Sequence, residues 1–244
     1  MKLRIEKSVT VITPTIGSHK LRDAMESVCN QTYKSIKHLI VVDGPQHFNK
    51  AIQYVEVSNP DPKIQLAVSP ENTGANGFYG HRIYASYPHL INSEYVAFLD
   101  EDNWYDPEHI ESLVSTIESK NLNFSYSMRK IHNSDGKFLI EDNCESLGKW
   151  PIWHNREEYL VDTSSYLFKR DFLIQTCHLW HFGWGGDRRF FSLIKDKSNH
   201  DSSRKHTLCY RLDGNEGSVK ESFFINGNQN QNVTYNGKLP WKTF

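Results

Sequence analysis

In the first half of the chain, short apolar runs typical of strands alternate with segments whose apolar residues recur at the three- and four-residue spacing of a helix. Residues 9–13 (VTVIT) are mostly β-branched and stop at Pro14, which predicts a strand. In residues 20–30 (KLRDAMESVCN) apolar positions recur at spacings of three and four, which predicts an amphipathic helix. Residues 36–42 (IKHLIVV) predict a second strand. A strand, a helix and a strand with short connections indicate a parallel crossover unit.

A weaker unit of the same kind follows. Residues 48–57 predict a helix and residues 64–68 a short strand. Residues 74–87 are rich in glycine and aromatic residues, so we expect a loop that becomes helical. Residues 95–99 (YVAFL) predict a fourth, buried strand. This half therefore predicts an α/β fold, with a Rossmann-like, mostly parallel sheet flanked by helices.

An acidic cluster, Asp100-Glu101-Asp102, comes directly after the fourth predicted strand. Asp106 is expected to cap the next helix, with Pro107 at its first position. The acids would then lie on a strand-to-helix loop, at the sheet edge where open α/β folds bind ligands. Crowded carboxylates raise each other's pKa, and a bound Mg²⁺ or Mn²⁺ would relieve that repulsion. The alternative is a solvated, acid-rich turn.

The pattern changes after residue 120. Residues 124–131 and 137–140 flank the sequence NSDG, which predicts a hairpin. Tryptophans and histidines then appear with little periodicity, and the tail from Asn226 is expected to be loop-like and to pack across the body. We therefore divide one continuous domain into residues 1–120 and an irregular, aromatic-rich half, residues 121–244.

Composition excludes some classes of function. The chain has 244 residues, 38% of them hydrophobic, and a net charge of -1, which gives no electrostatic case for a nucleic-acid partner. Its four cysteines lack zinc-site spacing and are expected to be reduced thiols of a cytoplasmic protein. The N-terminus does not resemble a signal peptide, and no apolar stretch approaches the ~20 residues of a membrane span. Peripheral contact with a membrane, through a partner or a lipid substrate, stays open.

Four motifs occur in order along roughly residues 8–220. They are VTVITPT at 9–15 with SVCNQTY at 27–33 and HLIVVDG at 38–44, then ENTG at 71–74 with Arg82 downstream, FLDEDN at 98–103, and GWGGD at 183–187. Together they resemble family 2 glycosyltransferases of the GT-A fold. Each motif alone is weak, whereas their shared order and spacing are specific.

The resemblance implies a nucleotide-sugar donor, with a UDP-sugar favoured, and a divalent cation, Mn²⁺ or Mg²⁺. The donor-binding residues implied are Thr13, Thr15, Asp43, Asn72, Arg82, Asp100 and Glu101. Asp43 would read the nucleobase, although an Asp before Gly44 is also an ordinary turn residue. Asp102, with Asp100, would hold the metal, and Arg82 would face the base or diphosphate or else lie on a helix surface.

Asp187 is the general base that the resemblance implies, in an inverting transfer to a glycan or glycoconjugate such as a growing polysaccharide. A helix-capping role is compatible with this one. Two departures from the family pattern matter. Asp213 stands where relatives often have a histidine, so either Asp213 or His206 is the candidate third metal ligand. Gly186 stands where a second acid is common, which leaves a retaining mechanism open.

Trp184 and Trp180 are candidate acceptor-binding residues, because sugar faces stack on aromatic rings. The alternative for any one of these tryptophans is a place in the core. Two other functions stay open for the whole chain. One is a nucleotidyltransferase, although the sequence TIGSHK after the first strand makes a poor phosphate loop. The other is a non-catalytic protein of the same fold that binds a carbohydrate or a nucleotide sugar.

Overall fold

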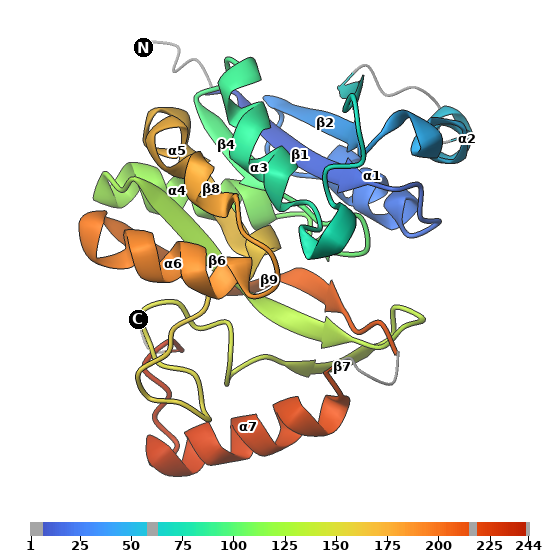
Figure 1. Ribbon diagram of the computed structural model, residues 1–244. Helices are drawn as coiled ribbons and strands as arrows, with labels where there is room; N and C mark the ends of the chain where they lie inside the picture. The colour runs from blue at the N-terminus through green and yellow to red at the C-terminus, as the bar shows by residue number, and fades with distance from the viewer. Residues whose placement is uncertain (1–6, 58–62, 215–218, 243–244) are drawn as a thin grey trace.

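Four parallel strands begin the sheet in the computed structural model, which describes residues 7–57, 63–214 and 219–242. They are β1 (Val9–Thr15), β2 (Ile36–Val42), β3 (Ile64–Val68) and β4 (Tyr95–Phe98), in the spatial order β3–β2–β1–β4 (Figure 1). Helix α1 (Leu21–Cys29) joins β1 to β2, and α2 (Phe48–Val57) follows β2. The predicted parallel crossover is confirmed, so all four strands end at the same edge.

The rest of the sheet is mixed and continues from β4. Strand β8 (Tyr166–Lys169) pairs antiparallel with β4, and β6 (Phe124–His132), β9 (His200–Arg211) and β5 (Trp104–Tyr105) follow in space. The predicted hairpin is present, since β7 (Phe138–Glu141) pairs antiparallel with β6. One sheet therefore crosses the division that the sequence suggests near residue 120.

Helices cover both faces of the sheet. On one face, Ile12 packs in the same cluster as residues of α3 (His81–Ser86), α5 (Arg170–Thr176) and α6 (Gly186–Ile194). On the other face, Val11 packs with residues of α1 and of α4 (His109–Lys120). Successive side chains of a strand point to opposite faces, so β1 contributes to both clusters. The result is the predicted α/β fold.

Short 3₁₀ segments connect these elements. They are η1 (Pro45–His47), η2 (Ala75–Gly77), η3 (Tyr87–Leu90), η4 (Thr163–Ser165), η5 (Cys177–Trp180) and η6 (Lys195–Lys197). The predicted change from loop to helix within residues 74–87 is confirmed by η2 and α3.

Two predicted boundaries are wrong. Strand β1 continues through Pro14 to Thr15. The N–H of Leu99 donates to the carbonyl oxygen of Ile12 (3.0 Å), so the backbone polar groups of Ile12, and of every second residue from it, point toward β4. Strand β4 pairs with β1 only as far as Ile12, so the same side of β1 is open beyond that residue. Pro14 faces that open side, where no N–H is required. Helix α4 begins at His109 rather than beside Asp106.

The prediction of a loop-like tail is also wrong. Residues Glu221–Thr234 form α7, which lies along the β6–β7 hairpin, away from β1–β4 (Figure 1). The expected packing across the body is confirmed further on, because Trp241 is fully buried beside Met128 and Leu147. In the three described stretches, no helix combines the length and apolar character needed to cross a bilayer.

Candidate active site

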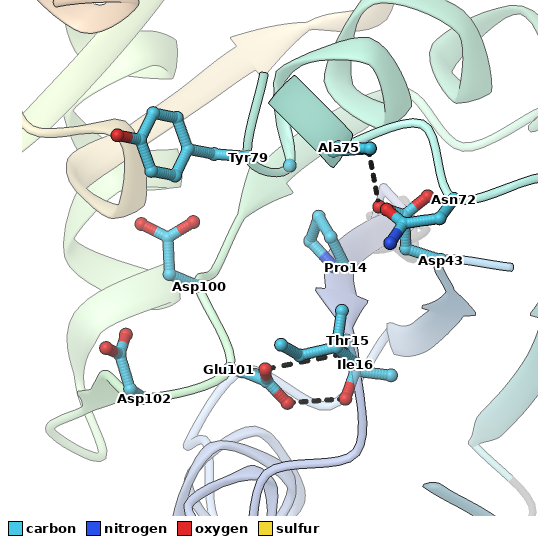
Figure 2. A pocket seen from close by; sticks show the side chains of 12 residues that line it. Pro14, Thr15, Ile16, Asp43, Asn72, Ala75, Tyr79, Asp100, Glu101 and Asp102 are labelled. Atoms are coloured by element: carbon cyan, nitrogen blue, oxygen red, sulfur yellow. Dashed lines mark hydrogen bonds between the residues drawn. The ribbon is translucent and has the colours of Figure 1, made fainter. Parts of the chain in front are cut away.

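A pocket of about 330 Å³ opens where β1, β2 and β4 end. Its walls come from four loops that follow parallel strands or precede α3 (Figure 2). The lining residues are Pro14, Thr15, Ile16, Asp43, Asn72, Gly74, Ala75, Tyr79, Gly80, Asp100, Glu101 and Asp102. Six residues that the sequence assigns to donor or metal binding thus lie around one cavity, at the sheet edge where the fold predicts a ligand.

Asp43 forms one side of the pocket and fixes the turn beside it. Its carboxylate accepts hydrogen bonds from the N–H of Thr73 (2.7 Å), the Thr73 hydroxyl (2.8 Å) and the N–H of Gly74 (2.7 Å). A Cβ on Gly74 would lie 2.3 Å from the Tyr79 carbonyl oxygen and 2.8 Å from Asp43 Oδ2. Only glycine therefore fits that turn. A carboxylate has about four lone-pair sites, so Asp43 can still accept from a ligand.

Asp100 lies across the pocket from Asp43 (Figure 2). The Tyr84 hydroxyl donates to Oδ1 (2.7 Å), and the Ser164 hydroxyl contacts Oδ2 (3.2 Å). Burial, with the negative charges of Asp102 and Asp162, raises the pKa of Asp100 to about 7. The environment thus disfavours a bare carboxylate here, and a cation would stabilise it.

The surroundings of Asp102 also disfavour its ionised form. Burial and the charge of Asp213 raise the pKa of Asp102 to about 6. Asp213 is itself half exposed and lies 3.8 Å from the ammonium group of Lys20. Over the described ranges 7–57, 63–214 and 219–242, no three His, Cys, Asp or Glu side chains gather as a ready-made metal site. The carboxylates alone therefore do not form a complete metal cage.

Glu101 turns away from its two acidic neighbours and shapes the loop after β1. It accepts hydrogen bonds from the Thr15 hydroxyl (2.5 Å) and from the N–H of Ser18 (3.0 Å). The Thr15 oxygen in turn accepts from the N–H of Gly17 (2.9 Å). The hydrogen bond between Thr15 and Glu101 thus joins the loop after β1 to the loop after β4 at the rim of the pocket (Figure 2).

Two candidate donor-binding side chains do not line the pocket. Thr13 is fully buried, and its hydroxyl lies 2.8 Å from His38 Nε2, so its expected contact with a nucleoside is wrong for the side chain. Arg82 donates to the carbonyl oxygen of Thr73 (3.3 Å) and lies 3.5 Å from the centre of the Phe78 ring. Arg82 therefore supports the turn that Asp43 binds, from outside the lining.

Asp187 is the second residue of α6 and is partly exposed. Its Oδ1 accepts from the N–H of Arg188 (2.8 Å). The guanidinium of Arg188 pairs with Glu145 (2.7 Å), which anchors the first turn of the helix. Burial first, and then the negative charge of Asp187, raise the pKa of Tyr166.

The two candidate acceptor tryptophans have different environments. Trp184 is 83% exposed, so its ring is available to a ligand, whereas Trp180 is fully buried. Trp180 stacks on Phe190 with 4.3 Å between ring centres, inside the core beneath α6. The acceptor assignment of Trp180 is therefore wrong. The side chain of His206 is buried, with Nδ1 3.9 Å from Oε1 of Glu141, and it does not line the pocket. His206 is therefore removed as a candidate metal ligand.

Several residues of the site carry no sequence motif. Tyr79 and Gly80 line the pocket, and Tyr84 and Ser164 bond Asp100. The glycine- and aromatic-rich composition of residues 74–87 predicted a loop that becomes helical, but not a contact with the pocket or with Asp100. Ser164 comes from η4, more than sixty positions after Asp100, so no local pattern could indicate it.

Comparisons with known proteins agree on one family. The family described as Glycosyl transferase family 2 matches residues 10–191. Similar curated proteins include Glycosyltransferase GlyA of Streptococcus pneumoniae, which is 29% identical over 114 residues, covering 46% of this chain and 15% of GlyA. Another is UDP-Glc:alpha-D-GlcNAc-diphosphoundecaprenol beta-1,3-glucosyltransferase WfgD of Escherichia coli, 29% identical over 136 residues, covering 54% of this chain and 50% of WfgD. The alignments thus span half or less of these relatives.

Solved structures agree with the fold. Residues 1–349 of S. aureus TarS in complex with UDP-GlcNAc superpose with a TM-score of 0.60 at 14% identity, covering 88% of this chain and 60% of that one. The same part of TarS in complex with UDP also gives a TM-score of 0.60, covering 94% of this chain and 72% of that one. At such identities the likeness establishes the fold alone.

Proposed function

The chain belongs to glycosyl transferase family 2, and on that premise we propose that it transfers a sugar from a UDP-sugar to a hydroxyl group of a glycan or glycoconjugate. The observation that carries the proposal is the pocket at the strand ends, with Asp43 on one side and Asp100 and Asp102 on the other. WfgD is a UDP-Glc glucosyltransferase by name, and TarS has been solved in complex with UDP-GlcNAc, which favours uracil among the nucleobases.

Within this pocket, Asp43 would accept a hydrogen bond from a ring N–H of the base. Asn72 and Thr15 would lie against the nucleoside, since both face the same cavity. Arg82 would act through the turn that it supports. Residues 1–120 would thus bind the donor, and residues 121–244 would supply the acceptor side, including the exposed ring of Trp184.

A divalent cation, Mn²⁺ or Mg²⁺, fits the donor set. Asp102 and Asp100 offer hard oxygen ligands whose raised pKa values reflect burial and neighbouring negative charge, and Asp213 adds a third acid nearby. Such ions are commonly held by one or two carboxylates together with substrate phosphates. When bound, the cation would neutralise charge on the departing diphosphate.

Asp187 would be the general base of an inverting transfer. The acceptor hydroxyl attacks the anomeric carbon as the bond to the nucleoside diphosphate breaks, and its proton passes to the Asp187 carboxylate. Arg188 supports this role by tying the first turn of α6 to Glu145. Inversion needs no covalent bond between enzyme and sugar.

Nucleotide release from a panel of nucleotide sugars tests the donor site. We expect slow hydrolysis of one UDP-sugar with Mn²⁺, and its loss with EDTA and in Asp102→Asn. Asp196→Asn is the matched control, because Asp196 is an exposed acid paired only with Lys195 in the part of the chain described here. If no nucleotide sugar is bound or hydrolysed, the donor assignment fails and a carbohydrate-binding protein becomes the better explanation.

Asp187→Asn tests the base. We expect it to lower kcat of transfer by about 10²–10⁴-fold while leaving donor binding, measured by calorimetry with UDP and Mn²⁺, unchanged. Equal transfer rates in the variant and the wild type would exclude Asp187 as the base. The configuration of the product, read by NMR, separates inversion from retention.

A further inference from the structure

His81 joins the loop that lines the donor pocket to the segment that leads into α6. It is the first residue of α3 and follows Gly80, which lines the pocket. Its Nδ1 lies 2.7 Å from the carbonyl oxygen of Phe182. A carbonyl oxygen only accepts, so Nδ1 carries the proton and donates.

The imidazole also occupies the space beside Gly186, the residue before Asp187. A Cβ on Gly186 would lie 2.6 Å from Cε1 and 2.7 Å from Nδ1 of His81. Gly186 begins α6, whose helical backbone alanine adopts readily. Glycine is therefore required at this position by the histidine ring. Gly185 differs, because its φ of +74° requires glycine although a Cβ there would meet nothing within 4 Å.

Two further contacts join the same segments. The rings of Phe78 and His181 lie 5.4 Å apart. A Cβ on Gly183 would lie 3.1 Å from the carbonyl oxygen of Gly77, so the two backbones pass close together. Residues 181–186 thus lie along residues 77–81, and the ring of His81 is backed by Trp180, 5.6 Å away between ring centres.

We propose that His81 is a positioning residue: it holds the start of α6, and with it the carboxylate of Asp187, against the loop that binds the donor. The inference rests on the proposed function, since it assigns His81 a role in positioning Asp187 as the general base. A donor bound against Tyr79 and Gly80 would thus lie on the same loop that fixes the base. Misplacing a reacting group by about 1 Å can cost about 10²-fold in rate.

A double-mutant cycle tests the contact. Gly186→Ala alone should lower the midpoint of thermal unfolding, because its methyl group meets the ring. In the His81→Ala background the same change should cost nothing further, because the ring is gone. His81→Asn should retain an N–H near the Phe182 carbonyl oxygen and recover part of the loss. The control is His178→Ala, since His178 is an exposed histidine of η5.

The kinetic readout separates positioning from a general loss of structure. We expect His81→Ala and Gly186→Ala each to lower kcat of transfer about 10- to 100-fold, with the donor KM within about twofold of the wild type. The double variant should be no worse than His81→Ala. Additive losses, or a raised donor KM with kcat unchanged, would overturn the role of His81. A wild-type chain that turns over no nucleotide sugar would instead overturn the proposed function.

Discussion

Replacing Arg129 with methionine is expected to remove a large part of the stability of the fold. Arg129 is 3% exposed, and its guanidinium meets three buried acids. Nε donates to Asp142 and Nη1 to Asp162, each at 2.7 Å, and Nη2 pairs with Glu145. Methionine is of similar length but carries no charge, so Arg129→Met leaves these carboxylates buried beside a neutral side chain.

The magnitude follows from that burial. Removing one partner of a buried ion pair typically costs about 3–5 kcal/mol, because the remaining charge stays out of water. Arg188 still pairs with Glu145 at 2.7 Å, which favours the lower end of that range. For a chain of this size, such a loss lowers the unfolding temperature by roughly 6–20 °C.

The loss should also depend on pH. Burial alone would raise the pKa of Asp142, but Arg129 and backbone N–H donors hold it below its usual value. In the variant Arg129 no longer opposes the effect of burial, so the folded-state pKa of Asp142 is higher than in the wild type. As pH falls, the folded variant then binds protons before the folded wild type does, which costs the variant less stability than it costs the wild type. The difference in unfolding free energy between the wild type and the variant should therefore be smaller at pH 5 than at pH 8.

Urea unfolding followed by tryptophan fluorescence at these two pH values measures both effects. Lys120→Met is the matched control, because Lys120 is 47% exposed and pairs with Asp201 at 2.5 Å. An exposed pair contributes about 0.2–1 kcal/mol, so the control should change little. The reasoning fails if Arg129→Met costs no more than the control, or if its cost is the same at both pH values.

Three further predictions test packing, exposure and acid stability. Gly148 has a φ of +65° and a Cβ there would lie 2.1 Å from a buried tyrosine ring, so Gly148→Ala should cost about 2–5 kcal/mol in urea unfolding. Gly237→Ala is the control, because Gly237 has a φ of +75° but a Cβ there would meet nothing closer than Asn232 Oδ1 at 3.9 Å; it should cost about 1–2 kcal/mol. Equal losses in the two variants would exclude a contribution from the clash at Gly148. Trp184→Ala should change the unfolding free energy by no more than about 0.5 kcal/mol from the wild type and should lower kcat/KM for the acceptor. Trp180→Ala should lower the unfolding free energy by about 3–5 kcal/mol. A larger loss of stability in Trp184→Ala than in Trp180→Ala would contradict the burial of the two rings. Two lysines, acting against the effect of burial, lower the pKa of Asp201 to about 2. The ionised carboxylate therefore stabilises the fold fully above about pH 4, and this contribution is lost as pH falls through about 2. The acid-unfolding curves of wild type and Asp201→Asn should converge at low pH, and a constant offset would be inconsistent with this.

Periodicity predicted the elements that position the donor pocket. The bounds of β2, α2 and β3 agree with the predicted segments, because short apolar runs and amphipathic spacing reflect burial on one or both sides. Since parallel strands end at one edge, the acids after β2 and β4 had to lie near each other. In the structure Asp43 and Asp100 both line one cavity at that edge.

Other expectations failed where local sequence is ambiguous. Asn- and Gly-rich residues in α7 have weak helix propensity, yet the helix forms because its apolar side packs on the β6–β7 hairpin. Trp180 and Trp184 lie in the same short segment with opposite exposure. Composition could not distinguish them, because exposure depends on which elements pack above each ring.

The sequence by itself determined the order of strands and helices in the first half of the chain, the parallel crossover and the acids at the strand ends, because these depend on neighbours along the chain. Only the tertiary structure decided which distant groups meet. Arg129 gathers acids from residues 142–162, Ser164 bonds Asp100, and His81 requires a glycine before Asp187. Such contacts are set by the packing of one element on another and have no signature in the spacing of residues along either element.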